Sequence, residues 1–342
     1  MAKRALVISG GGCKGAFAVG VLKNLAANFP DISFDIFIGT STGSLIVPFA
    51  SLGRIDVLEQ LYTSITTDQV VVKGNIVARL LGNNSLFDAT PLGNLIKQHY
   101  IDDTCNQVFQ SGKEVFFATT CLQTGASVNF STTDAALVSD YEIIKLNNPD
   151  EMRRAIMASA CQPVFMPPIE VKPGVLPIRQ YVDGGVKEYA GIQLAIDAGA
   201  DEIYAILLTP DTPDVKEQVF NDAFSILEDT IDIFTSGVGR NDVRVPVMYN
   251  RSLQYIASVQ KKMLAAGISQ NDIDNYFNIP FNNPYTGKKP LNIYVIRPDA
   301  ALGGGMGGLD FDPTLMKGML VKGQQTIDEF MAGLPPQVSN IV

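Results

Sequence analysis

Three short glycine-containing stretches carry the residues whose types and spacing could do chemistry. Residues 10–15 read GGGCKG, residues 39–43 read GTSTG and residues 183–185 read DGG. Backbone N–H groups of a glycine loop can stabilise an oxyanion, a serine in G-x-S-x-G can attack a carbonyl, and a carboxylate can accept the serine proton. If the three stretches meet in the fold, the chemistry that they support is acyl transfer.

The second stretch, Gly39-Thr40-Ser41-Thr42-Gly43, has the form of a nucleophile elbow. An elbow needs a strand before the serine and a helix after it, because the chain turns sharply and exposes the hydroxyl. The apolar run before Gly39 predicts the strand, and a helix is predicted from about Gly43. The alternative for the same residues is a helix N-cap, with Ser41 or Thr42 accepting from a helix amide.

The base for such a serine must come from elsewhere in the chain. The one histidine, His99, falls on a predicted helix, so a Ser-His-Asp triad is not favoured. Asp183 ends a predicted strand, and Gly184 and Gly185 allow another backbone to come close. An aspartate is a weak base at neutral pH unless its pKa is raised. The alternative for the Asp-Gly-Gly sequence is a plain turn.

The first glycine stretch also fits a dinucleotide-binding loop, because Gly10, Gly12 and Gly15 have the G-x-G-x-x-G spacing. Such a site needs an acidic residue at the end of the second strand. Asp35 has the right spacing but lies at the start of its predicted strand. Lys14 is followed by glycine, so no P-loop pattern is present. We favour oxyanion donors here and keep nucleotide binding as an alternative.

The elements around these motifs predict an α/β protein. Apolar runs predict strands at 4–9, 34–39, 114–122, 127–131, 179–183, 202–208 and 291–298. Helical spacing predicts helices at 15–29, 54–66, 90–100, 149–160, 191–199 and 313–332. The alternation implies a mostly parallel sheet with helices on both faces. We expect strands 4–9, 34–39 and 179–183 to run parallel, so that their carboxyl ends meet at one edge.

The later part of the chain carries less chemical information. No shift in composition marks a boundary, and we predict a single domain over residues 1–342. Residues 215–277 form a mostly helical insertion that serves as core, as a lid or as a cover for an acyl chain. One of its apolar stripes comprises Phe220, Phe224, Leu227, Ile231 and Phe234. Residues 302–308, LGGGMGG, predict a flexible loop, to which we assign no chemical role.

Composition excludes several classes of function. The 342 residues are 46% hydrophobic and 18% charged, with a net charge of −9 and a pI near 4.7. This acidity argues against nucleic acid as a partner. One histidine and four separated cysteines give no zinc pattern and no disulfide framework, and we expect no metal and no cofactor. The N-terminal apolar run is too short for a signal peptide and no run suits a membrane span, so we expect a soluble cytoplasmic protein.

In this order, GGGCKG, GTSTG and DGG resemble the motifs of the patatin-like phospholipases, a group of serine acyl hydrolases. "LFDATPL" (86–92) and "ASACQPVFMPP" (158–168) are also similar to bacterial members. The resemblance implies a three-layer fold and a dyad in which Ser41 is the nucleophile and Asp183 its base. It implies an oxyanion loop made of Gly10, Gly11, Gly12, Cys13, Lys14 and Gly15. Lys14 stands where the family often has arginine.

The resemblance also implies the substrate, a lipid ester cleaved in the manner of a phospholipase A, a lysophospholipase or a lipase. Such a substrate can be met at a membrane surface, without a transmembrane segment in the enzyme. Two alternatives share the motifs: a catalytically inactive binding protein of the same fold, and an acyltransferase that passes the acyl group to an alcohol.

Overall fold

One large β-sheet forms the centre of the protein. The computed structural model describes residues 2–74, 83–134, 141–212, 217, 219–279, 281, 283–285 and 287–333. The eight described strands of the sheet run in the order β10-β9-β1-β2-β5-β6-β7, with β8 paired to β5. They are β1 (Arg4–Ile8), β2 (Ile36–Thr40), β5 (Glu114–Cys121), β6 (Ser127–Ser131), β7 (Glu142–Lys145), β8 (Tyr181–Asp183), β9 (Glu202–Ile206) and β10 (Asn292–Ile296). A separate ribbon pairs β3 (Val72–Lys73) with β4 (Phe87–Asp88).

Strand direction divides this sheet into two parts. β10, β9, β1, β2 and β5 are mutually parallel. β6 and β8 are antiparallel to β5, and β7 follows β6. The expectation of a mostly parallel sheet is therefore confirmed. The expectation that the strand ending at Asp183 runs parallel to β1 and β2 is wrong, since β8 runs the opposite way.

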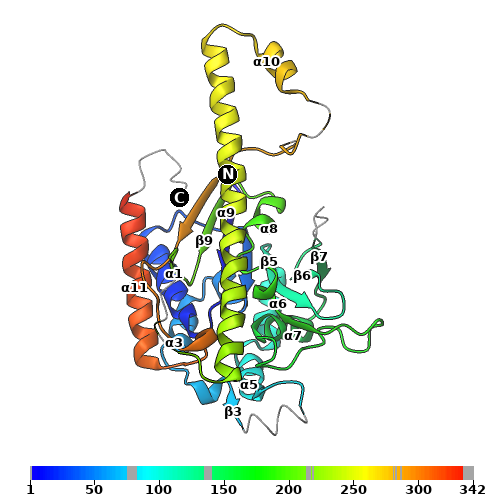
Figure 1. Cartoon of the computed structure of the whole chain (residues 1–342), viewed down its shortest axis with the longest axis vertical. Helices are drawn as coiled ribbons and strands as arrows, with labels where there is room; N and C mark the ends of the chain where they lie inside the picture. The colour runs from blue at the N-terminus through cyan, green and yellow to red at the C-terminus, as the bar shows by residue number, and fades with distance from the viewer. Residues whose placement is uncertain are drawn as a thin grey trace.

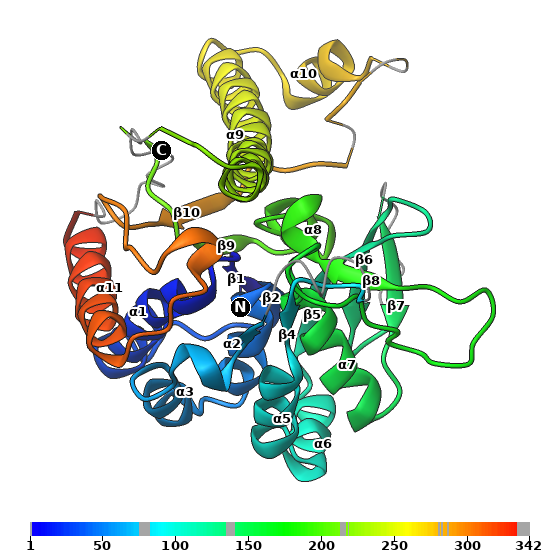
Figure 2. The same cartoon turned by 60° about the horizontal axis from the view of Figure 1, so that its bottom comes forward.

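Helices cover both faces of the sheet (Figure 2). One face carries α1 (Gly15–Asn28), α2 (Thr42–Ser51), α3 (Ile55–Tyr62), α5 (Thr90–His99), α6 (Asp102–Gln110), α7 (Pro149–Ala160) and α11 (Pro313–Gly333). The other carries α8 (Ile192–Asp197) and α9 (Ala223–Ala265). Successive β1 side chains enter the two cores in turn, with Leu6 and Ile8 in one and Ala5 and Val7 in the other. This alternation is what a sheet buried on both faces requires.

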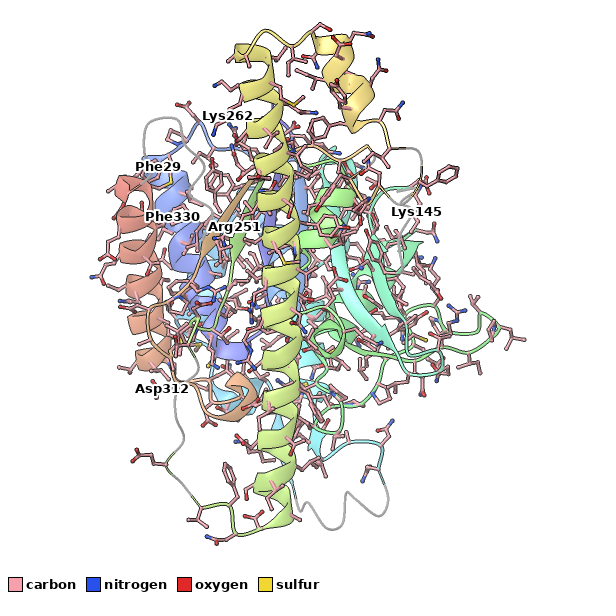
Figure 3. The ribbon with its side chains drawn as sticks, turned by 45° about the horizontal axis from the view of Figure 1, so that its top comes forward. Phe29, Lys145, Arg251, Lys262, Asp312 and Phe330 are labelled. Atoms are coloured by element: carbon pink, nitrogen blue, oxygen red, sulfur yellow. The ribbon has the colours of Figure 1, made fainter. Side chains whose placement is uncertain are left out.

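α1 and α11 pack closely because glycines let their backbones approach. A Cβ added to Gly20 would lie 2.0 Å from the Leu320 carbonyl oxygen, and one added to Gly323 would lie 2.1 Å from that of Phe17. Figure 3 shows Phe29 and Phe330 at one end of this pair and Asp312 at the other. Each helix follows a glycine-rich loop, so their packing brings the two loops together.

The longest helix, α9, crosses the sheet face and continues beyond it, where α10 (Gln270–Phe277) turns back (Figure 1). Asn250 ties it to the sheet by two bonds with the Leu291 backbone, of 2.7 and 3.0 Å, just before β10. Of the predicted apolar stripe, Ile231 packs against the core whereas Leu227 and Phe234 are exposed. The Phe224 side chain lies outside the described residues. In the described chain, no helix combines the length and the apolarity that a membrane crossing requires.

Candidate active site

The carboxyl ends of β2 and β8 meet head-on beside β5. Thr40, the last residue of β2, pairs with Ala118 of β5, and Asp183, the last of β8, pairs with the next residue, Thr119. Thr119 also pairs with Val128 of β6, so β8 must lie on the same side of β5 as β2. The antiparallel direction of β8 therefore delivers Asp183 to the residue that follows β2, which is Ser41.

Ser41 occupies the sharp turn between β2 and α2. Its backbone has φ 57° and ψ −122°, a conformation that non-glycine residues rarely adopt and that functional turns tolerate. The turn fits because Gly39 and Gly43 have no side chains. A Cβ at Gly43 would lie 2.2 Å from the Ile8 carbonyl oxygen, and one at Gly39 would lie 2.5 Å from the Gly43 backbone. These close approaches account for both glycines of the G-x-S-x-G pattern.

Ser159, which the sequence did not single out, holds the same turn from behind. Its hydroxyl accepts a 3.0 Å bond from the Ser41 N–H and donates a 2.6 Å bond to the Ala118 carbonyl. The elbow is thereby tied to both α7 and β5. Ser159 lies within residues 158–168, a stretch noted above for its similarity to bacterial proteins. That similarity was the available signal, because nothing in the residue types of the stretch points to this role for Ser159.

Asp183 is 6% exposed and Ser41 7%, and the Ser41 hydroxyl lies close enough to the Asp183 carboxyl group to lower its pKa. The carboxylate accepts a 2.8 Å bond from the Gly185 N–H. Burial raises the pKa of Asp183 to about 6, and the Ser41 hydroxyl and the Gly185 N–H oppose this rise. Gly184 is required for packing, because a Cβ there would lie 2.5 Å from the Ala118 carbonyl oxygen. A buried carboxylate with this pKa is a stronger base than an ordinary aspartate.

The first glycine loop lies beside this pair and leads into α1. A short 3₁₀ helix, Gly12–Lys14, precedes α1, so the N–H groups at its start have no partner within the helix. A Cβ at Gly10 would lie 3.1 Å from the Ser41 Cβ, which places the loop in contact with the serine. Gly12 has φ 58°, a conformation that suits glycine.

The side chains of Thr40, Thr42 and Cys13, and the absence of one at Gly15, serve packing around the site. Thr40 donates a 3.2 Å bond to the Glu188 carbonyl, and Thr42 is hydrogen-bonded to Tyr62. A Cβ at Gly15 would lie 2.7 Å from that Thr42 hydroxyl. Cys13 is buried, and burial raises the pKa of its thiol to about 11. Cys105, Cys121 and Cys161 are free and buried as well.

A second glycine loop supports the first, although the sequence gave no reason to assign it a role. Gly308 packs backbone to backbone against the first loop, and a Cβ there would lie 2.1 Å from the Gly11 carbonyl oxygen. In turn a Cβ at Gly12 would lie 2.3 Å from the Gly308 carbonyl oxygen. Gln162 donates a 3.1 Å bond to the Gly307 carbonyl. The glycine run in residues 302–308 was the only signal, and its composition does not reveal a partner.

A large cavity of about 1080 Å³ contains Ser41 and Asp183. Gly10, Gly11 and Lys14 line it near the serine. α9 contributes two neighbouring rows of residues spaced four apart. The first row is Ile231, Thr235, Gly239, Val243, Val247 and Arg251, the second is Asp232, Ser236, Arg240, Arg244 and Met248, and Asn241 and Val245 line the cavity as well. Figure 3 shows Arg251 on the part of α9 in front of the sheet and Lys262 further along the helix. One wall of the cavity is therefore a face of α9.

A second, narrow pocket of about 70 Å³ opens on the other side of Ser41. Its wall is mainly apolar and comes from α2, α3, α5 and the region 307–316. The lining includes Leu45, Leu58, Leu61, Ile65, Val70, Leu92, Leu95, Ile96, Leu309, Phe311 and Met316. None of the lining residues belongs to 215–277.

Two residues weighed in the sequence make no hydrogen bond to Ser41 or Asp183 in the described chain. His99 lines the narrow pocket, but within the described chain it makes no hydrogen bond to Ser41 or Asp183. Burial lowers its pKa. Asp35 accepts a 3.1 Å bond from the Arg4 N–H at the amino ends of β1 and β2, whereas the glycine loop follows the carboxyl end of β1. A ribose-binding acid is expected at that other edge. Among the described residues, no three His, Cys, Asp or Glu side chains are grouped to hold a metal ion.

Fold and site define a three-layer α/β protein with a serine at a strand-to-helix turn beside a buried aspartate. The patatin-like phospholipase family matches residues 6–196. The chain belongs to this family of lipid acyl hydrolases. A search of curated proteins found no significant match. Among solved structures, the crystal structure of VipD from Legionella pneumophila is similar, with a TM-score of 0.44 and 11% identity over 97% of this chain and 67% of VipD.

Proposed function

We propose that the protein is a serine hydrolase that cleaves carboxylic esters of lipids, with Ser41 as nucleophile and Asp183 as general base. The observation that carries the proposal is the strand geometry that brings Ser41, at its strained turn, beside the buried Asp183 carboxyl group in a cavity bordered by a glycine loop. The family supports the reaction class. A dyad without imidazole also agrees with the position of His99.

In the proposed first step, Ser41 Oγ attacks the ester carbonyl carbon while Asp183 accepts the hydroxyl proton. Negative charge develops on the carbonyl oxygen, and the N–H groups of Gly11, Gly12 and Cys13 stabilise it. The tetrahedral intermediate then expels the alcohol, which receives its proton from Asp183. The product is an ester between Ser41 and the acyl group.

In the second step water replaces the alcohol. Asp183, again ionised, accepts a proton from the water as its oxygen attacks the acyl-enzyme carbonyl. The second tetrahedral intermediate collapses, the proton returns to Ser41 Oγ, and the carboxylic acid leaves. The same N–H groups hold the oxyanion in both steps.

The two cavities suggest how a lipid ester divides at Ser41. We propose that the narrow apolar pocket holds the acyl chain and the large cavity holds the alcohol part. Each buried methylene contributes about 0.8 kcal/mol, so a fitting chain gains affinity with length. In this arrangement α9, which belongs to residues 215–277, covers the cavity that holds the alcohol part of the ester. The role of residues 215–277 as a lid stays a prediction.

Leu61 offers a test of the acyl pocket. It is partly exposed, so a larger ring there can enter the pocket without disrupting a closed core. We expect Leu61→Trp to lower kcat/KM for p-nitrophenyl laurate at least about tenfold relative to p-nitrophenyl acetate. Leu61→Met, which conserves volume, should keep the wild-type ratio. If Leu61→Trp left the laurate-to-acetate ratio of kcat/KM unchanged, the acyl chain would have to bind outside this pocket.

The pH dependence of kcat/KM follows from Asp183. A general base must be ionised, and the pKa of Asp183 is about 6. Activity should be constant above about pH 7 and fall about tenfold per pH unit below 6. Cys161, whose thiol pKa is raised mainly by burial and further by Asp183, stays neutral across this range. A profile flat down to pH 4.5 would rule out an Asp183 base with this pKa.

The function itself is tested by incubating the protein with p-nitrophenyl esters and with a lysophospholipid, with and without added alcohol. Release of free carboxylic acid supports a hydrolase. Transfer to the alcohol in preference to water supports an acyltransferase. No turnover of any ester, together with no labelling by a fluorophosphonate, supports an inactive binding protein.

A further inference from the structure

We propose that Tyr189 is a positioning residue, one that fixes the peptide unit between Gly10 and Gly11 and so aims the Gly11 N–H at the oxyanion. This inference rests on the proposed hydrolase function. Tyr189 is 7% exposed and lies six residues after Asp183, outside the glycine motifs.

The contact that carries the inference is a buried 2.7 Å hydrogen bond from the Tyr189 hydroxyl to the Gly10 carbonyl oxygen. The Gly10–Gly11 peptide is trans, so its C=O and N–H point in opposite directions. Holding the Gly10 carbonyl therefore also sets the direction of the Gly11 N–H. That N–H is one of the proposed oxyanion donors.

This peptide needs an external hold because glycine lies on both sides of it. Gly10 and Gly11 lack side chains, so a rotated peptide plane meets little steric resistance. Gly11 has φ 153°, which shows that the loop uses this freedom. In a loop of ordinary residues, sterics would restrict the plane without the tyrosine.

The tyrosine is itself fixed between the catalytic loops and α9. A Cβ at Gly10 would lie 3.4 Å from its ring, and one at Gly185 would lie 3.6 Å from it. On the far side, a Cβ at Gly239 of α9 would lie only 2.6 Å away, so α9 can approach the ring only through a glycine. Asp242 of α9 accepts the N–H of Tyr189 at 2.6 Å. α9 thus acts on the glycine loop through Tyr189.

Ser9 is a second, weaker donor to the same carbonyl. Its hydroxyl lies 3.2 Å from the Gly10 oxygen and also accepts a 3.0 Å bond from the Leu208 N–H. Loss of Ser9 should therefore have a smaller effect than loss of the tyrosine hydroxyl.

The test is Tyr189→Phe, which removes the hydroxyl and keeps the ring. We expect kcat for p-nitrophenyl butyrate to fall about 10- to 100-fold while KM changes less than about threefold, because an oxyanion donor acts mainly in the transition state. Affinity for an alkyl trifluoromethyl ketone, which adds to serine as a tetrahedral oxyanion, should fall by a similar factor. Affinity for the fatty acid product should not change.

Two further variants separate positioning from packing. Tyr141→Phe removes a comparable 2.9 Å hydroxyl bond, to Asp197, away from both cavities, and should keep wild-type kinetics. Gly239→Ala pushes a methyl group into the Tyr189 ring and should lower kcat, with KM nearly constant.

Wild-type kcat and inhibitor affinity in folded Tyr189→Phe would overturn the inference. If Ser41→Ala were inactive in the same assay, the proposed function would survive that result. Full activity of Ser41→Ala would overturn both.

Discussion

Replacing Ser41 by alanine is expected to lower kcat for p-nitrophenyl ester hydrolysis at least about 1000-fold, the loss that removal of a catalytic nucleophile produces. Asp183→Asn should lose activity to a similar extent, because an amide cannot accept the serine proton. The two losses should not add in the double variant, since both residues act in one step. An active single variant would refute the dyad.

The stability of Asp183→Asn separates loss of chemistry from loss of fold. Burial raises the pKa of Asp183 from 3.8 to about 6, so its ionised form costs roughly 3 kcal/mol of folding free energy above pH 7. Asparagine does not carry this cost and can still accept the Gly185 N–H. We expect its melting temperature at pH 8 to equal or exceed that of the wild type. A strongly lowered melting temperature would make the kinetic loss a folding effect.

Replacing Gly43 by alanine is expected to have the second largest effect. The added methyl group would lie 2.2 Å from the Ile8 carbonyl oxygen, and backbone rather than a flexible side chain opposes it. α2 must then move away from β1, which disturbs the turn at Ser41. We expect a loss of at least about 3 kcal/mol in the free energy of unfolding by urea, and little remaining esterase activity.

Gly93→Ala is the matched control. Gly93 lies in α5, and an added Cβ there meets no atom within 4 Å. The same chemical change should leave activity intact and raise stability by up to about 1 kcal/mol, because alanine favours the helix. If Gly43→Ala were as stable and active as Gly93→Ala, the close approach of α2 to β1 would not be needed for the elbow.

The sequence predicts the elements of this fold because their signals are local. The apolar run before Gly39 and the helical pattern after Gly43 predict the strand and the helix on either side of Ser41. Gly39 and Gly43 indicate that the backbone comes close to other backbone at this turn, which leaves no room for a side chain. Likewise, the helical spacing within 215–277 predicts α9, because periodicity within one segment identifies a helix.

Pairing between distant segments could not be predicted in this way. β8 has three residues, and nothing in Tyr181–Asp183 tells whether it runs with β5 or against it. The expected meeting of Ser41 and Asp183 therefore rested on a wrong strand direction. The contact of Gly308 with Gly12 and that of Tyr189 with Gly10 likewise join segments far apart in the chain. Composition shows only that those loops are rich in glycine.

The most direct test of the dyad is mass spectrometry after reaction with a fluorophosphonate. The wild type should carry one adduct, on Ser41, and labelling should fall sharply in Asp183→Asn and at pH values below 6. Labelling of Asp183→Asn at the wild-type rate, or an adduct on another residue with Ser41 unmodified, would contradict the account.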